Sequence, residues 1–240
     1  MEQIKIEELK DWIAPYLTIT GNHPKINEKL RKESIISYFR QLTIPNIFDN
    51  YALILHPYWI YDLPKEKTKE NHIEGKDIEN YKSEFPEEDY RPVKWIDFYN
   101  YKNVEFSLET AITENVEWNR PFSQMNNEMW PCEGGIDMRT LQNISETILK
   151  FHGDCNIELY YIFMATKNYD EDEMYKGKLS ELISFLNNYD SVLTPSLIYD
   201  IEKKWAITSD FDLPFSIIGG EKNLIIELLE NNQNEIYLIE

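Results

Sequence analysis

Two aspartates separated by a single residue are the side chains of this sequence best spaced to share a cation. Asp210 and Asp212 follow a short apolar run at 205–207. On an extended backbone, residues two apart project to the same side, so the two carboxylates could hold a divalent ion together. Such a site usually needs more oxygen ligands, and the adjacent sequence supplies none. Because Pro214 follows and turn residues are common where a strand ends, the sequence favours a turn over a metal site.

His56 is the histidine most suited to proton transfer. It stands between an apolar segment at 51–55 and Pro57, so we expect it at the end of a buried strand. A histidine there could donate or accept a proton near neutral pH. A partly buried histidine with its hydrogen bonds satisfied is the favoured interpretation. An enzyme site that gathers His56, Asp210 and Asp212 remains an alternative.

Four consecutive acids follow the apolar segment at 157–165: Asp170, Glu171, Asp172 and Glu173. They resemble the first half of a calcium-binding loop. Counted from Asp170, however, the sixth position is Tyr175, where such a loop requires glycine. We therefore expect a solvated acidic loop, available as a binding surface, and no calcium.

Metal and nucleophile signatures are weak elsewhere in the chain. Cys132 and Cys155 are the two cysteines, and His152 lies three residues before the second. Zinc needs more ligands than this spacing offers, and no disulfide framework is present. The sequence also lacks a phosphate-binding loop, a dinucleotide fingerprint and a nucleophile elbow. We expect no metal and no cofactor, and an enzyme is the less favoured class.

The net charge of the chain restricts the classes of partner that it can bind. Its 240 residues carry 43 acids and 24 bases, a formal net charge of −19. Residues 1–50 hold seven of each, so the later part carries the whole excess. Nucleic acid and anionic membranes are disfavoured partners, since both attract basic proteins. A basic protein is the favoured one, and an acidic surface would steer it into contact.

Composition also indicates the class of chain and its compartment. Sixteen tyrosines and six tryptophans argue against intrinsic disorder. The charged N-terminus lacks the apolar core of a signal peptide, and no run of about 18 apolar residues could span a membrane. We expect a cytoplasmic protein with reduced thiols.

The hydrophobic pattern predicts an α+β fold, with a mixed or antiparallel sheet and flanking helices, because helices and strands do not alternate strictly. We expect one domain, 1–240, with a helical N-terminal part at 1–45 and an exposed acidic loop or insertion at 62–92. The predicted helices are 2–16, 26–42, 93–101, one opening near 107, 137–151, 179–187 and 224–229. The predicted strands are 51–55, 157–165, 205–207, 214–218 and 235–239, with a turn at Gly219 and Gly220.

Three short motifs resemble a group of uncharacterised bacterial proteins. They are a strand ending in Leu55-His56-Pro57, a Pro131-Cys132-Glu133-Gly134-Gly135 stretch before a helix, and a tryptophan strand that runs from Trp205 through Asp210-Phe211-Asp212-Leu213 to Gly219-Gly220. The resemblance is scattered over about residues 45–240 and is most specific at the C-terminal motif. It implies no activity, so no catalytic residue is transferred from it.

In composition the chain looks like the immunity proteins of bacterial polymorphic toxin systems, which tend to be small, acidic and rich in aromatic residues. That resemblance implies a non-enzymatic protein that neutralises a basic toxin domain through an acidic surface bearing aromatic anchors. Residues 62–90 and 170–173 are the candidate contact regions. The alternatives are an enzyme of unknown reaction with a His/Asp site, and a structural or scaffolding component.

Overall fold

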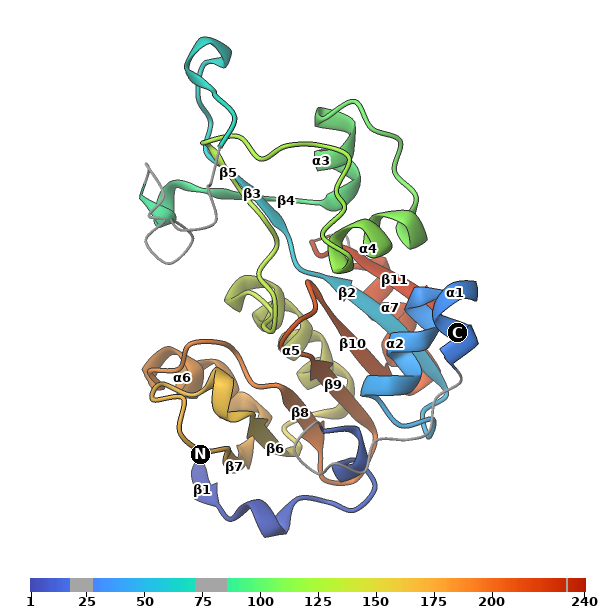
Figure 1. The fold of residues 1–240 in the computed structure, drawn as a ribbon. Helices are drawn as coiled ribbons and strands as arrows, with labels where there is room; N and C mark the ends of the chain where they lie inside the picture. Colours follow the sequence, from blue (N-terminus) through green and yellow to red (C-terminus); the bar gives the residue numbers. More distant parts are fainter. Residues whose placement is uncertain (18–27, 72–85, 232) are drawn as a thin grey trace. The chain divides into compact units, whose positions relative to one another are not determined.

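The computed structural model describes residues 1–17, 28–71, 86–231 and 233–240, and these form two compact units (Figure 1). Unit 1 contains Met1–His56 and Cys132–Glu240, and unit 2 contains Pro57–Pro131. The sequence predicts a single domain in which 62–92 is a loop. In the structure the described part of that segment belongs to unit 2. Each unit is built around its own antiparallel sheet.

Unit 1 is built on an eight-stranded sheet with the strand order β1-β7-β6-β8-β9-β10-β2-β11. Its strands are β1 (Glu2–Ile4), β2 (Asn50–Leu55), β6 (Asn156–Tyr161), β7 (Glu173–Lys178), β8 (Leu197–Asp200), β9 (Trp205–Ser209), β10 (Phe215–Gly220) and β11 (Ile236–Ile239). Every pairing in it is antiparallel. The helices of this unit are α1 (Glu28–Glu33), α2 (Ile35–Thr43), α5 (Met138–His152), α6 (Leu182–Asn188) and α7 (Lys222–Glu230). The predicted α+β class with flanking helices is confirmed.

Helices cover both faces of the large sheet. Phe39 of α2 contacts the ring of Phe215, with the ring centroids 5.9 Å apart. Gly220, five residues further along β10, faces Leu224 of α7. Because side chains alternate along a strand, these two contacts lie on opposite faces. We call them the α2 face and the α7 face, and α5 packs against α7.

The longest helix, α5, confirms the helix predicted at 137–151. Asp137 is the N-cap of α5, and its side chain accepts a hydrogen bond from the amide of Thr140. Gly153 ends the helix with a φ of 68°, a conformation that glycine adopts at no steric cost. Local chemistry at both ends therefore fixes this helix.

The N-terminal segment departs from the prediction. Instead of a helix at 2–16, β1 pairs with β7 and two short 3₁₀ turns follow, Ile6–Glu8 and Ala14–Tyr16. Contacts distant in sequence hold the segment in place. Lys10 Nζ lies 3.1 Å from a carboxylate oxygen of Glu158, which is 3 % exposed. Tyr199 also donates to that carboxylate, so a buried charge is both neutralised and hydrogen-bonded.

The second predicted helix, 26–42, is divided. α1 ends at Glu33 and α2 begins at Ile35, with Ser34 between them in an extended conformation. The hydroxyl of Ser34 accepts a hydrogen bond from the amide of Ser37 and so caps α2. Residues 26 and 27 lie outside the described part of the chain.

Besides β1, two further strands of unit 1 were not predicted, and one strand is shorter than predicted. β7 begins at Glu173, the last of the four acids, and β8 occupies 197–200. The predicted strand 157–165 ends at Tyr161, and a 3₁₀ turn, Phe163–Ala165, follows. Both missed strands are held by partners on each side, β7 by β1 and β6 and β8 by β6 and β9.

The predicted turn at Gly219 and Gly220 is wrong, because both residues belong to β10. Gly219 pairs with Tyr51 on one side and Ala206 on the other. The rings of Phe48 and Tyr51 occupy the space where a side chain would stand, and a Cβ on Gly219 would lie 2.3 Å from a Phe48 ring carbon. Glycine is needed here for close packing of aromatic rings, not for a turn.

Unit 2 has a three-stranded sheet in the order β4-β3-β5, none of which was predicted. Its elements are β3 (Tyr58–Ile60), β4 (Arg91–Val93), α3 (Trp95–Tyr101), α4 (Leu108–Val116) and β5 (Glu128–Met129). The two helices agree with the predictions at 93–101 and near 107. Tyr58 and Phe98 stack with centroids 3.9 Å apart at the centre of an aromatic core.

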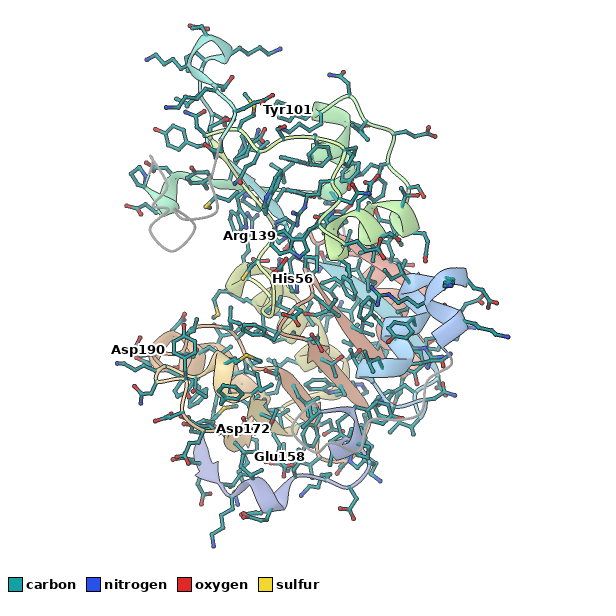
Figure 2. The ribbon with its side chains drawn as sticks, viewed as in Figure 1. His56, Tyr101, Arg139, Glu158, Asp172 and Asp190 are labelled. Atoms are coloured by element: carbon teal, nitrogen blue, oxygen red, sulfur yellow. The ribbon has the colours of Figure 1, made fainter. Side chains whose placement is uncertain are left out.

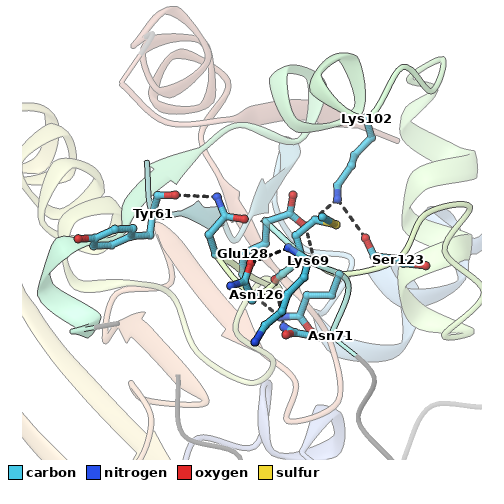
Figure 3. A network of polar contacts seen from close by, with 10 residues as sticks. Tyr61, Lys69, Asn71, Lys102, Ser123, Asn126 and Glu128 are labelled. Carbon is cyan, nitrogen blue, oxygen red and sulfur yellow. Dashed lines mark hydrogen bonds and ion pairs between the residues drawn. The ribbon is translucent and has the colours of Figure 1, made fainter. Parts of the chain in front are cut away.

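The described part of the predicted 62–92 loop is folded onto unit 2 (Figure 3). Lys69 and Asn126 exchange two hydrogen bonds, at 3.1 Å and 2.9 Å. Beside them Glu128, 1 % exposed, accepts from Lys102 Nζ at 2.7 Å. Polar contacts, rather than packed aliphatic side chains, therefore hold this segment in place. Residues 72–85, the remainder of the predicted contact region there, lie outside the described residues.

Replacing Gly219 with alanine tests the packing argument. We expect Gly219→Ala to lower the free energy of unfolding by about 1–3 kcal/mol, because the Phe48 ring must move. Urea denaturation followed by tryptophan fluorescence measures the loss. Gly220→Ala is the matched control, since the same substitution at the next position of β10 meets the flexible end of Leu224 at 3.2 Å and should cost less. Equal stability of the Gly219→Ala variant and the parent would contradict the argument.

Candidate functional site

The three motif segments meet within unit 1. His56 Nδ1 lies 2.6 Å from the carbonyl oxygen of Cys132. The amide of Gly134 donates to the carbonyl of Leu213 at 3.1 Å, and the amide of His56 donates to the carbonyl of Pro214 at 3.2 Å. A strand end, the loop before α5 and the β9–β10 turn are thus joined by hydrogen bonds.

The His56 side chain is the centre of this junction and is fully buried, 0 % exposed (Figure 2). Burial lowers the pKa of its imidazole from 6.5 to about 4, although the Cys132 carbonyl and the charge of Asp137 act in the opposite direction. The ring is therefore neutral at pH 7. Since the Cys132 carbonyl can only accept, Nδ1 carries the proton and donates to it.

A chain of hydroxyls completes the network. His56 Nε2 accepts from Ser216 Oγ at 2.8 Å, and Ser216 Oγ in turn lies 2.6 Å from Ser209 Oγ. With the Ser216 proton directed to His56, Ser209 must donate to Ser216. Both ring nitrogens are thus occupied inside the fold, so the network holds three segments in register.

Asp210 and Asp212 form a turn. The amide of Asp212 donates to Asp210 Oδ1 at 3.1 Å, and the amide of Leu213 donates to the Asp210 carbonyl at 3.1 Å. Within the described residues, no group of three or more His, Cys, Asp or Glu side chains could hold a metal ion. The turn interpretation of these aspartates agrees with the structure.

The aspartates also border a cavity of about 130 Å³. Its lining residues are Tyr16, Leu17, Thr43, Tyr160, Ile162, Met164, Ser196, Thr208, Ser209, Asp210, Phe211 and Asp212. Thr208 pairs with Ile217, which shares the α2 face with Phe215. Ser216, the partner of His56, alternates onto the α7 face. The imidazole therefore lies on the α7 face, and Ser209, which hydrogen-bonds to Ser216 and also lines the cavity, connects its network to the cavity.

The four-acid run divides into an inner and an outer pair. Asp172 accepts from the amide of Phe163 at 2.6 Å and from the Tyr160 hydroxyl at 2.8 Å. Glu173 accepts from the hydroxyls of Tyr175 and Tyr189. Burial, and then the hydrogen bond to Glu173, raise the pKa of Tyr175 to about 12.

The outer pair, Asp170 and Glu171, is exposed and lies in a surface that we call the acidic–aromatic patch. It consists of Phe163, Tyr169, Asp170, Glu171, Asp190 and Val192. Its three apolar members are 41 %, 56 % and 47 % exposed, for Phe163, Tyr169 and Val192 respectively. A hydrogen bond and an ion pair connect its two segments: the Val192 amide donates to the Ala165 carbonyl at 3.1 Å, and Lys167 pairs with Asp190.

A groove of about 310 Å³ adjoins the patch. It is lined by Cys132, Gly135, Ile136, Asp137, Met138, Leu186, Tyr189, Ser191, Val192, Leu193 and Thr194. One wall is the loop held by His56 and the start of α5, and the other is the segment after α6. A Cβ on Gly134 would lie 2.8 Å from Leu193, so glycine lets the two walls approach. Val192 belongs to both groove and patch.

Sequence reasoning identified the acids but missed most of the patch and all of the groove. Phe163 was assigned to a strand, and Asp190 and Val192 carried no distinguishing signal. Their proximity depends on the contact between 165 and 192, which no local pattern encodes. The closest sequence signal was the neighbouring Tyr169-Asp170 pair, an aromatic residue beside the predicted acidic loop.

No protein-family model matches this chain, and no curated protein or solved structure matches it either. Within the described residues, no helix is both long and apolar enough to cross a membrane. Cys132 and Cys155 are free thiols.

The buried imidazole predicts a pH dependence of stability. Because the pKa of His56 is lowered to about 4 in the folded protein, the unfolded chain binds its proton more tightly. The stabilisation is complete above about pH 6.5 and is lost as the pH falls to about 4, a change of roughly 3 kcal/mol. Urea unfolding at a series of pH values measures it.

His56→Gln is the control for this titration. Its amide nitrogen can donate to Cys132 and its oxygen can accept from Ser216, without a titrating group. We expect a shallower decline in unfolding free energy between pH 6.5 and 4 for this variant. Identical slopes for the parent and the variant would show that His56 is not responsible.

Proposed function

We propose that this chain is a non-enzymatic binding protein that holds a basic protein on the acidic–aromatic patch, in the manner of an immunity protein that neutralises a bacterial toxin domain. The supporting observation is the patch itself, in which Phe163, Tyr169 and Val192 are each more than 40 % exposed beside the exposed acids Asp170 and Glu171. Large apolar side chains surrounded by charge are typical of protein interfaces.

Tyr169 adds a second argument from backbone conformation. Its φ is 57°, in the left-handed region, which costs a residue with a side chain about 1–2 kcal/mol. The ring gains little burial in return, since it is 56 % exposed. An aromatic residue held in an unfavourable conformation at the surface contributes little to the fold and suits an interface anchor.

The charge of the patch selects the partner. Residues 163–173 and 189–193 contain five carboxylates and one lysine. Asp172 and Glu173 are engaged internally and Asp190 is paired with Lys167, so Asp170 and Glu171 provide the outward negative charge. Together with the net charge of −19, this favours fast, salt-sensitive association with a basic surface.

The enzyme alternative has less support. It required His56, Asp210 and Asp212 to act on one substrate, yet the imidazole is fully buried on the α7 face. The aspartates border a cavity that His56 does not line. No observation among the described residues specifically favours a scaffolding role.

Charge neutralisation on the patch tests the proposal. The tagged protein is used to capture its partner from the native lysate, with washes at low and high salt, and the partner is identified by mass spectrometry. We expect Asp170→Asn/Glu171→Gln to slow association with that basic partner about tenfold at low salt, because steering is weakened. Stopped-flow or biolayer interferometry measures the rates.

Glu221→Gln/Glu230→Gln is the matched control, since it removes the same charge from exposed positions at and beside α7. It should change the association rate far less. An association rate that is the same at low and at high salt, or equally slowed by both double variants, would contradict recognition through this patch.

A substitution at Tyr169 separates binding from folding. Asparagine tolerates a positive φ, so Tyr169→Asn should leave the melting temperature unchanged or slightly raised. Loss of the anchor should weaken partner binding by about tenfold or more, measured by titration calorimetry. Trp118→Asn is the matched control, because Trp118 is also exposed, 66 %, and has a φ of 53°. Equal losses of affinity in both variants would argue against a special role for Tyr169.

A further inference from the structure

We infer that the groove beside the patch receives one apolar side chain of the basic partner, with an adjacent lysine or arginine directed to the carboxylate of Asp137. This inference rests on the proposed function and specifies the chemistry of the partner. The occupant is an extended segment in which an apolar residue is flanked by basic ones.

The size and lining of the groove fit such a segment. Its volume of about 310 Å³ is at the small end of the range for ligand pockets, roughly 300–1,000 Å³. One or two side chains would fill it. Five of its lining residues are apolar and of aliphatic or thioether type: Ile136, Met138, Leu186, Val192 and Leu193.

Two polar atoms on its walls lack a partner. Asp137 Oδ1 accepts from the Thr140 amide at 3.0 Å, but Asp137 Oδ2 is withdrawn from water and has no hydrogen bond within the described residues. The hydroxyl oxygen of Thr194 is likewise buried and has no hydrogen bond within the described residues. A buried carboxylate oxygen without a donor is unfavourable, so a ligand that supplies an N–H group would stabilise the site.

The electrostatic environment favours a cation. None of the described lining residues is Lys, Arg or His. Burial raises the pKa of the Cys132 thiol, and the negative charges of Glu133 and Asp137 raise it further, so the wall at Cys132 is at negative potential. Val192 makes the groove continuous with the patch, and a basic segment lying across the patch would reach it.

Cys132 provides a probe inside the groove. In a Cys155→Ser background, its reaction rates with a cationic and an anionic methanethiosulfonate of equal length report the local potential. Relative to N-acetylcysteine, we expect the ratio of cationic to anionic rates to be raised about fivefold or more at low salt. The preference should fade at 1 M salt, where the Debye length is about 3 Å.

Asp137→Asn keeps the helix cap, because asparagine is an equally good N-cap, and should reduce this preference. Asp154→Asn, which removes an exposed charge beside a different helix, should leave it unchanged. A rate ratio equal to that of N-acetylcysteine would overturn the cation preference of the groove.

Short peptides test the occupant. Acetyl-Lys-Leu-Lys-amide at millimolar concentration should slow the reaction of Cys132 with the methanethiosulfonates about threefold or more. The Glu-Leu-Glu and Lys-Ser-Lys peptides should not slow it. Absence of protection, or equal protection by Lys-Ser-Lys, would overturn the inference. If the groove fails these tests while Asp170→Asn/Glu171→Gln still slows association with the captured partner, the proposed function survives without it. If both fail, the binding proposal itself is wrong.

Discussion

The hydrogen bonds of one neutral, buried imidazole hold in place the loop that forms one wall of the groove in unit 1. His56 donates to the Cys132 carbonyl and accepts from Ser216, so it joins the end of β2, the loop before α5 and the strand β10. Each such hydrogen bond contributes only about 1 kcal/mol net, but leaving one of these buried groups unpaired costs about 1–3 kcal/mol. The loop at 132–135 is therefore held in place, and with it Asp137 at the start of α5. One wall of the groove follows directly from that histidine.

Some of the many carboxylates are used inside the fold, where they are paired or hydrogen-bonded. Glu158 is neutralised by Lys10 and hydrogen-bonded by Tyr199, and Asp172 and Glu173 accept from tyrosine hydroxyls. In these places tyrosine acts as a donor to carboxylates inside the structure, which gives the many tyrosines a structural role. Asp170 and Glu171 remain exposed beside exposed apolar side chains, so part of the charge excess stands next to an apolar surface.

The parts of the fold that were predicted correctly are those fixed by local chemistry. α5 has its Asp137 cap, its apolar spacing and its terminal Gly153 within one stretch of sequence. β1 could not be predicted, because Glu2–Ile4 becomes a strand only by pairing with β7. Gly219 reads as a turn residue until the ring of Phe48, far away in sequence, is seen to occupy its side-chain space.

In the candidate site, too, the features set by local sequence were predicted and those set by distant contacts were not. Burial of His56 and the turn at Asp210 and Asp212 agree with the interpretations favoured from sequence. The sequence did not reveal that Ser209 connects the network of His56 to the 130 Å³ cavity, since that depends on strand register. Nor did it place Val192 beside Ala165, because the hydrogen bond between them joins two segments that are distant in sequence.

Hydrogen exchange measured by mass spectrometry, on the free protein and on its complex with the captured basic partner, tests the central claim most directly. The account predicts that exchange slows about tenfold or more in peptides covering 163–173 and 186–194, with smaller changes elsewhere in unit 1. Unchanged exchange in both segments, with protection confined to other regions of the chain, would contradict recognition through the acidic–aromatic patch and its groove.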